Sequence, residues 1–173
     1  KIDYIIQSEG DQSFYKLCNA LESNEDCKGI SGLVYKDGEK SLTINPITEI
    51  VADLDELSLP DYSYAGEWIK RNEFGYLITS RGCPVNCSFC STSTFWGQKV
   101  RMNSPERVGE EIDYLKSLGA KRFFFHDDTF NLGISRTLRL AEILKEKKIE
   151  YAVSCRVSPV SEEMIAKLVE SGC

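Results

Sequence analysis

The sequence predicts an α/β fold, and three observations lead to this prediction. From Phe74 onward, short apolar runs alternate three times with amphipathic segments. Two of these segments begin at a serine suited to a helix N-cap and end at a glycine suited to a helix stop. Upstream, residues 30–45 have the pattern of a β-hairpin. Three consecutive βα units are typical of a parallel sheet or a βα barrel.

The composition limits the class of protein. The chain of 173 residues has 42% hydrophobic residues and a net charge of −6, and its length suffices for one sizeable core. The acidic balance disfavours a nucleic-acid or anionic-membrane surface, so we expect no nucleic-acid partner. No apolar run approaches the roughly 20 residues that a membrane span requires, and no signal peptide is recognisable. A cytoplasmic location is therefore expected.

The first predicted element is a strand followed by a helix. Residues 3–10 form an apolar run that ends at Gly10, and residues 11–23 follow with helical periodicity. Either Asp11 or Ser13 is suited to cap this helix. Its apolar spacing is carried by Phe14, Leu17, Cys18 and Leu21.

A hairpin and a linker are predicted next. Residues 30–45 contain two β-prone runs around Asp37-Gly38, a strong hairpin signal. Residues 49–64 have neither a helical nor a strand period and contain Pro60, which indicates an ordered linker. The predicted domain organisation is a first part over 1–48, a linker over 49–73 and a βα region over 74–173.

The βα region contains three strands and three helices in alternation. The strands are predicted over 74–80, 121–128 and 150–157, and the helices over 104–119, 135–148 and 158–172. Ser104 and Pro105 start the first helix, and Gly119 stops it. Ser161 caps the third helix, and Gly172 stops it.

Polar segments follow all three strands. They are the cysteine-containing loop after the first strand, "DDTF" after the second and "RVSP" after the third. In folds of this kind the chemistry lies beyond the C-terminal ends of the strands. We therefore expect these segments to share one rim.

The loop after the first strand carries Cys83, Cys87 and Cys90 with the spacing C-x3-C-x2-C. Thiolates suit zinc and iron–sulfur clusters, but structural zinc sites and ferredoxin-type clusters want four protein ligands. Three thiolates on a cubane cluster leave one iron open as a substrate site. His126 or Cys155 could instead complete a zinc site, so a non-catalytic zinc or iron–sulfur binding module is the alternative.

The neighbours of the three cysteines suit a cluster. Gly82 and Pro84 permit a loop that wraps it, and Phe89 supplies an apolar surface beside Cys90. An odd number of cysteines without a secretion signal favours a metal site over disulfides. The remaining cysteines are interpreted as small buried hydrophobes: Cys18, Cys27, Cys155 and Cys173.

The C-x3-C-x2-C spacing with an aromatic residue before the last cysteine resembles the signature of radical S-adenosylmethionine (SAM) enzymes. "TSRGCPVNCSFCSTSTFWGQKVRMNSPERVGEEIDYL", "FFFHDDTFNL", "LDELSLPDY" and "YIIQSEGDQSF" are similar to the cobalamin-binding subgroup of that superfamily. The resemblance implies a partial (βα) radical SAM barrel with three βα units of the usual six. It also implies a preceding strand–helix remnant of a Rossmann-like cobalamin-binding domain and a β-hairpin. The sequence is therefore expected to be a fragment of a longer enzyme, inactive by itself.

The resemblance also implies the chemistry. Cys83, Cys87 and Cys90 match the ligands of a [4Fe–4S] cluster whose open iron binds SAM. Reductive cleavage of SAM then gives a 5′-deoxyadenosyl radical, here for cobalamin-dependent methyl transfer or a related radical reaction. The implied partners are a small-molecule or natural-product substrate and a reductant such as flavodoxin or ferredoxin, with cobalamin bound by the longer protein.

Four further cofactor contacts follow from the resemblance. Asp127 and Asp128 stand where the family receives the SAM ammonium, although strand alternation prevents both from pointing inward. The alternative is that one of them caps the following turn. Arg156 could bind the SAM carboxylate or form a surface ion pair, and Phe89 lies beside the cluster. His126 is expected to pack rather than to catalyse.

Overall fold

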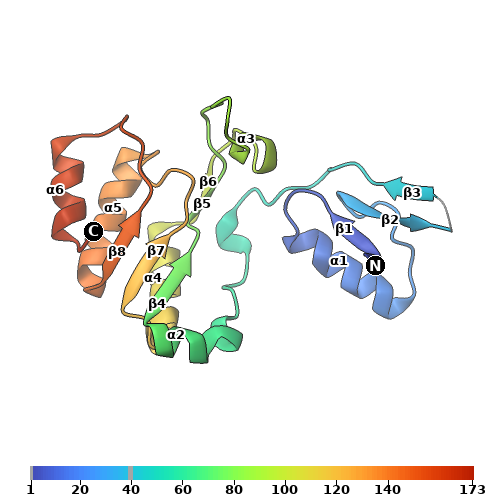
Figure 1. Ribbon diagram of the computed structural model, residues 1–173, viewed down its shortest axis with the longest axis horizontal. Coiled ribbons are helices and arrows are strands. Elements are labelled where there is room, and N and C mark those ends of the chain that lie inside the picture. The colour runs from blue at the N-terminus through green and yellow to red at the C-terminus, as the bar shows by residue number, and fades with distance from the viewer. Residues whose placement is uncertain (1, 39–40) are drawn as a thin grey trace. The chain divides into compact units, whose positions relative to one another are not determined.

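The computed structural model of the protein describes residues 2–38 and 41–173. The chain divides into two compact units, 1–52 and 53–173, so the boundary falls inside the segment 49–73. The first unit carries an antiparallel sheet, and the second carries the parallel βα region (Figure 1).

The first unit is a three-stranded sheet with one helix. Its elements are β1 (Tyr4–Ile6), α1 (Asp11–Ser23), β2 (Leu33–Asp37) and β3 (Ser41–Ile44). The strands pair antiparallel in the order β1-β2-β3, which confirms the hairpin predicted over 30–45. Residues 39–40 of its connection lie outside the described residues. Because β1 pairs antiparallel with the hairpin, the Rossmann-like assignment of this unit stays a prediction.

Helix α1 turns a different face to its core than the sequence suggested. Its buried residues are Ser13, Leu17 and Ala20. Phe14, Cys18 and Leu21 are exposed instead. Asp11 and Ser13 were predicted as caps, and this prediction is also wrong. The N-cap is Gly10, which has no side chain that could accept a hydrogen bond. The change of the buried face is explained by Ser13, whose side chain is buried and donates to the Ser31 carbonyl oxygen at 2.8 Å.

The segment predicted as a linker contains short helices. These are the 3₁₀ turns η1 (Leu54–Glu56) and η2 (Tyr62–Ala65) and the helix α2 (Gly66–Asn72). Asp53 and Asp61 cap the two turns by accepting backbone N–H groups. Elements this short show no readable period, which explains why the sequence pattern missed them.

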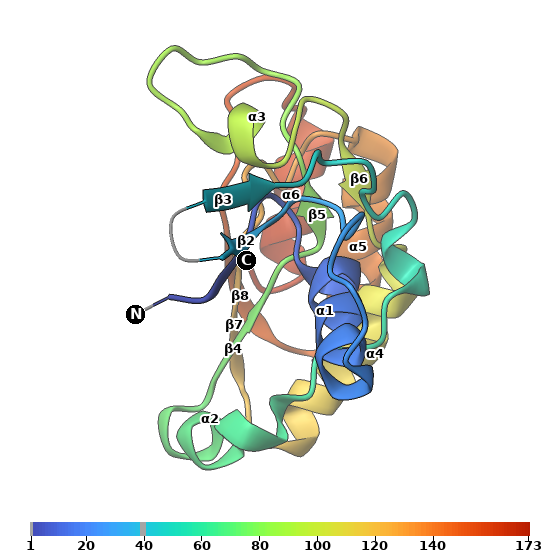
Figure 2. The same ribbon diagram turned by 90° about the vertical axis from the view of Figure 1, so that its right-hand side faces the viewer.

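The second unit confirms the three predicted βα units. The strands β4 (Phe74–Leu77), β7 (Arg122–Phe125) and β8 (Glu150–Val153) pair in parallel in the order β4-β7-β8. The helices are α4 (Pro105–Ser117), α5 (Ile134–Lys147) and α6 (Glu162–Glu170). Figure 2 shows α4 and α5 on one side of these strands.

The caps predicted for α4 and α6 are present. Ser104 Oγ accepts from the Arg107 N–H at 3.2 Å, and Ser161 Oγ accepts from the Met164 N–H at 3.1 Å. Gly119 and Gly172 follow the helix ends with φ of 106° and 101°, a conformation that favours glycine.

The two faces of the parallel sheet have different environments. One face supplies Leu77, Phe123, Phe125 and Tyr151 to a core shared with the three helices. The other face carries Tyr76 and His126, which are exposed, and Phe124, which is half-buried. The helices α4, α5 and α6 therefore pack on the same face of the sheet, as helices do on the wall of a barrel.

A further strand pair, β5 (Ser80–Arg81) with β6 (Arg101–Met102), and the short helix α3 (Thr92–Phe95) lie between β4 and α4. Among the described residues, no helix combines the length and the apolar character needed to cross a bilayer.

Candidate functional site

The three clustered cysteines lie on one loop at the C-terminal end of β4. The antiparallel pair β5–β6 forms the stem of this loop, which comprises residues 82–100 and is called the cysteine loop below. Figure 1 shows it at the end of the sheet where β7 and β8 also finish. Hydrogen bonds join it to the segment after β7, and that segment to the one after β8. The expected common rim is confirmed.

The cysteines differ in exposure. Cys83 is buried, Cys87 is half-buried and Cys90 is exposed. The Cys83 Sγ lies 3.9 Å from the hydroxyl of Thr129, and the Cys90 N–H donates to the Cys87 carbonyl at 3.0 Å. The hydroxyl and backbone N–H of Thr92 hold the pKa of the Cys90 thiol below its usual value, which favours the thiolate that binds metals.

Gly82 allows the loop to close at its base. Its φ is +97°, and a Cβ there would lie 2.5 Å from the Lys99 carbonyl oxygen. Next to it, the Cys83 N–H donates to the Gly97 carbonyl at 3.3 Å. The two ends of the loop thus approach through backbone contacts that only glycine at position 82 accommodates.

Aromatic residues occupy two places on the loop. Phe89 is 90% exposed beside Cys90, so its predicted place against a cluster stays a prediction. Phe95 and Trp96 meet edge to face with ring centroids 4.6 Å apart. The Arg81 guanidinium lies 5.1 Å from the Trp96 ring centroid and braces the loop against its stem.

Asp127 is buried under the loop. Its Oδ1 accepts from the backbone N–H groups of Thr79 and Ser80 at 2.5 and 3.1 Å, and its Oδ2 accepts from the Thr79 hydroxyl at 2.5 Å. Both carboxylate oxygens therefore bind the chain that leads into the stem.

Asp128 points the other way. It is exposed, and its Oδ1 accepts from the Thr92 hydroxyl at 2.8 Å. The expectation that the two acids face opposite sides is confirmed. Of the two, Asp128 is the one beside Cys90 that solvent can reach.

Arg156 follows β8 on the same rim. Its backbone N–H donates to Asn131 Oδ1 at 2.8 Å, and its carbonyl accepts from Asn131 Nδ2 at 2.9 Å. The same Nδ2 donates to the Pro159 carbonyl at 2.8 Å. Within residues 2–38 and 41–173, the Arg156 guanidinium forms no ion pair, so the surface-pair alternative is not seen there.

His126 lies on the face of the sheet opposite to the core shared with α4, α5 and α6. Its ring stacks on Tyr76 with centroids 5.4 Å apart and tilts against Phe124 at 4.6 Å. This packing agrees with the role expected from the sequence.

The other cysteines do not behave as predicted. Cys18, Cys155 and Cys173 are exposed, and Cys27 is half-buried, so their interpretation as buried hydrophobes is wrong for three of them. Cys18 is exposed because α1 turns its 13–17–20 stripe inward, and Cys155 because it follows the end of β8.

Two polar residues were missed, the buried Asn131 and the half-buried Arg136. Asn131 is fully buried, and Arg136 of α5 donates to the carbonyls of Thr79 and Asn103 at 3.0 Å each. A signal for Arg136 existed, because it lies one turn before the buried Leu140. Nothing in the pattern marked Asn131.

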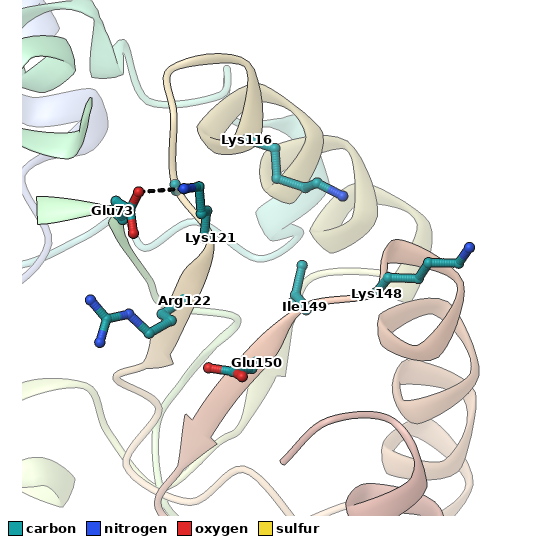
Figure 3. A pocket seen from close by; sticks show the side chains of 8 residues that line it. Glu73, Lys116, Lys121, Arg122, Lys148, Ile149 and Glu150 are labelled. Carbon is teal, nitrogen blue, oxygen red and sulfur yellow. Dashed lines mark hydrogen bonds and ion pairs between the residues drawn. The ribbon is translucent and has the colours of Figure 1, made fainter. Parts of the chain in front are cut away.

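The rim is not the only concave place. A cavity of about 570 Å³ lies at the opposite end of the sheet, where β4, β7 and β8 begin, and charged residues line it (Figure 3). Glu73 and Lys121 form an ion pair there. This cavity is separate from the cysteine loop, and in barrels the active site lies at the other end, where the strands finish.

The described part of the chain holds no three His, Cys, Asp or Glu side chains gathered as around a single metal ion. A [4Fe–4S] cluster takes each thiolate on a different iron, so its ligands stand further apart than those of one zinc ion. Cys83, Cys87 and Cys90 share one loop that closes at Gly82, and their role as cluster ligands stays a prediction.

A sequence model of the Radical SAM superfamily matches residues 77–173. The chain belongs to the radical SAM superfamily. Membership implies a [4Fe–4S] cluster and SAM as cofactors. The matched residues include all three segments of the rim, the cysteine loop among them. The match confirms the resemblance seen in the sequence.

The chain is similar to curated methyltransferases. It is 35% identical to an uncharacterized methyltransferase of Pyrococcus horikoshii, covering 99% of this chain and 39% of the relative. It is 23% identical to the cytidylyl-2-hydroxyethylphosphonate methyltransferase of Streptomyces wedmorensis, with the same coverage of 99% and 39%. The chain therefore spans about two fifths of the length of these curated relatives.

Solved structures show the same fold. The radical SAM methyltransferase TsrM from Kitasatospora setae, with tryptophan substrate and a SAM analogue bound, matches with a TM-score of 0.81 and 22% identity over 99% of this chain and 36% of that one. The cobalamin-dependent SAM radical enzyme OxsB, with aqua-cobalamin and SAM bound, matches with a TM-score of 0.80 and 22% identity over 98% of this chain and 27% of that one. The α/β fold is thus part of a radical SAM enzyme fold.

Proposed function

We propose that this chain carries the cluster site of a cobalamin-dependent radical SAM methyltransferase, with Cys83, Cys87 and Cys90 as the ligands of a [4Fe–4S] cluster. The observation that carries the proposal is the placement of three thiols, and no fourth from the same loop, on the C-terminal rim of a parallel sheet. When bound, the cluster supplies the electron that cleaves SAM to methionine and a 5′-deoxyadenosyl radical.

The chain's own residues would bind and orient the cofactors. Cys90 is favoured as a thiolate by Thr92, and the buried Cys83 has the Thr129 hydroxyl as a neighbour. The exposed Phe89 offers an apolar surface that excludes water from the cluster. These residues hold the cluster and shield it.

We assign the SAM ammonium to Asp128 and the SAM carboxylate to Arg156. Asp128 is exposed and, among the described residues, accepts a side-chain hydrogen bond at one carboxylate oxygen, whereas both oxygens of Asp127 accept from Thr79 and Ser80. Arg156 has a guanidinium without an ion pair among the described residues, and a guanidinium fork matches a carboxylate. Charge-assisted pairs of this kind fix orientation as well as affinity.

Methyl transfer and cobalamin enter from the relatives. The curated relatives named above are methyltransferases, and TsrM and OxsB have been solved with cobalamin. We infer a small-molecule substrate, because the TsrM structure holds tryptophan. A flavodoxin or ferredoxin would supply the electron.

Anaerobic reconstitution of the full-length protein with iron and sulfide tests the cluster. The wild-type protein should become brown and bleach with dithionite, and the triple variant Cys83→Ala, Cys87→Ala, Cys90→Ala should bind no iron. Changing Cys18 and Cys155 to Ala serves as the matched control and should leave the iron content unchanged. A colourless protein that takes up zinc would instead support the alternative, a non-catalytic zinc-binding module.

A further inference from the structure

Two charged side chains outside the cysteine loop, those of Asp127 and Arg136, form hydrogen bonds at the base of its stem. The entering strand of the stem begins after Thr79, and the leaving strand ends before Asn103. The Asn103 N–H donates to the Thr79 carbonyl at 2.9 Å, which closes the stem at its base. Both Thr79 and Asn103 are buried, so the carbonyls and N–H groups here need partners inside the protein.

Arg136 joins the two strands of the stem. Its Nη2 donates to the carbonyls of Thr79 and Asn103 at 3.0 Å each, and its Nε donates to the Asn103 carbonyl at 3.2 Å. A planar guanidinium spans both carbonyls at once, whereas the single ammonium of a lysine does not reproduce this fork. Arg136 therefore fixes the separation of the two chain ends that enter and leave the loop.

Asp127 holds the entering strand from the end of β7. It binds the N–H groups of Thr79 and Ser80 and the Thr79 hydroxyl. The same hydroxyl oxygen accepts from Arg136 Nη2 at 3.1 Å. Thr79 is thus a shared link between the buried carboxylate and the guanidinium, whose opposite charges compensate one another in a site with little water.

We propose that Asp127 and Arg136 are positioning residues that act through Thr79 and Asn103 to hold the three thiols of the cysteine loop in their cluster-binding arrangement. This inference rests on the proposed cluster site. It gives Asp127 a role other than contact with SAM, and it assigns a role to Arg136, which the sequence pattern did not single out. Among the described residues, Arg136 donates hydrogen bonds to Thr79 and Asn103 at the base of the stem, while its neighbours on α5, such as Leu140 and Leu144, fill the core.

The first experiment needs no cluster. The full-length apoprotein is digested briefly with chymotrypsin, for which Phe89, Phe95 and Trp96 of the loop are cleavage sites. In Arg136→Lys and Asp127→Asn, cleavage in the loop should be severalfold faster than in the wild type, because local opening of the loop becomes more frequent. Arg139→Lys is the matched control, since Arg139 lies on the same helix and forms surface ion pairs with Glu106 and Glu142.

The second experiment follows the loaded protein. Iron release to a chelator under anaerobic conditions should be roughly ten- to a hundredfold faster in Arg136→Lys and Asp127→Asn, the range found when a residue that supports metal ligands is changed. The electron paramagnetic resonance spectrum of the reduced cluster should broaden in the same variants. Arg139→Lys should match the wild type in both measurements.

A general loss of stability is separated by Ile143→Ala, which removes buried side-chain atoms of α5 that face Gly109 of α4. This variant should melt at a lower temperature but keep the wild-type rates of loop cleavage and iron release. If both rates in Arg136→Lys and Asp127→Asn equal the wild type, or if Ile143→Ala raises both rates as much as these two variants do, the inference is wrong. A wild-type protein that loads no cluster would overturn the proposed function and this inference together, whereas a loaded wild-type protein whose rates of loop cleavage and iron release are matched by both variants would overturn this inference alone.

Discussion

Asp127 and Asp128 are neighbours in sequence with opposite environments. The burial of one and the exposure of the other follow from strand alternation, which carries on past the end of β7. The sequence identified the pair as functional but could not decide between them, because the decision depends on which face of the sheet the helices cover. Asp127 contacts Thr79 and Asp128 contacts Thr92, and these contacts from other parts of the chain distinguish the environments of the two acids.

Asp128→Ala in the full-length protein should weaken SAM binding. Loss of one charged hydrogen bond costs about 1.5–3 kcal/mol, or roughly ten- to a hundredfold in the dissociation constant. Equilibrium dialysis with labelled SAM measures this. Asp113→Ala, which removes an exposed acid on α4 away from the rim, is the control. Unchanged SAM affinity in Asp128→Ala would remove the assignment of this residue.

Gly82→Ala should destabilise the cysteine loop. The new Cβ meets the Lys99 carbonyl at a positive φ, so we expect a loss of about 1–3 kcal/mol in the free energy of unfolding. Gly97→Ala is the comparison, because Gly97 also has a positive φ of +81° but has no atom within 4 Å of its added Cβ. Denaturant unfolding of both variants gives the difference, and an equal loss in the two would refute the close-contact explanation.

At the scale of elements, the sequence predicted what local chemistry determines. The serine caps and glycine stops of α4 and α6 are backbone signals that are independent of tertiary context, and both are confirmed. The buried face of α1 and the existence of α2 were not predicted. In α1 a serine took a core position because a carbonyl lay within its reach, and α2 is too short to show a period.

Helix α4 also contains a buried acid that should make stability depend on pH. Glu111 is 5% exposed, and burial raises the pKa of its carboxyl group although a hydrogen bond from Tyr62 opposes the rise. Because the folded pKa lies above the unfolded one, the folded state binds the proton more tightly. The contribution to stability is present in full below the unfolded pKa and is lost as the pH rises through the folded pKa.

Glu111→Gln should therefore flatten the fall of the free energy of unfolding as the pH rises from about 4 toward neutrality. Glutamine keeps an oxygen for the Tyr62 hydroxyl but cannot ionise. Glu110→Gln, at an exposed position of the same helix, is the control and should keep the wild-type slope. Denaturant titrations at several pH values measure the slopes, and the same slope in wild type and Glu111→Gln would contradict the prediction.

For the whole molecule, family and partial-barrel fold could be predicted because the cysteine spacing and the βα alternation are local patterns. The hydrogen bonds that support the cysteine loop could not be predicted. Thr79, Asn103 and Arg136 are far apart in the sequence, and the fold brings them together. The same holds for Asn131, whose single amide joins the segments after β7 and β8.

Cobalamin binding is a prediction for the full-length protein. The sequence resemblance includes the strand β1 and helix α1 of the first unit, and the relatives TsrM and OxsB were solved with cobalamin. The purified protein should retain hydroxocobalamin through gel filtration, as seen in its visible spectrum. The cysteine triple variant should retain it equally, since the cobalamin site is proposed to be separate from the cluster. A protein that loads the cluster but excludes cobalamin would contradict the subgroup assignment and leave the family membership intact.

Asp55 in η1 joins the segment before α2 to the end of the cysteine loop through hydrogen bonds. Its carboxylate accepts from the Ser104 N–H at 2.9 Å and from Asn103 Nδ2 at 3.2 Å, where the cysteine loop ends and α4 begins. The loop exit is therefore tied to a stretch of chain almost fifty positions earlier. Tolerance to insertions should change abruptly along this stretch. Extra residues before Asp53 leave the hydrogen bonds of Asp55 in place, whereas extra residues within η1 displace Asp55 and release the end of the loop.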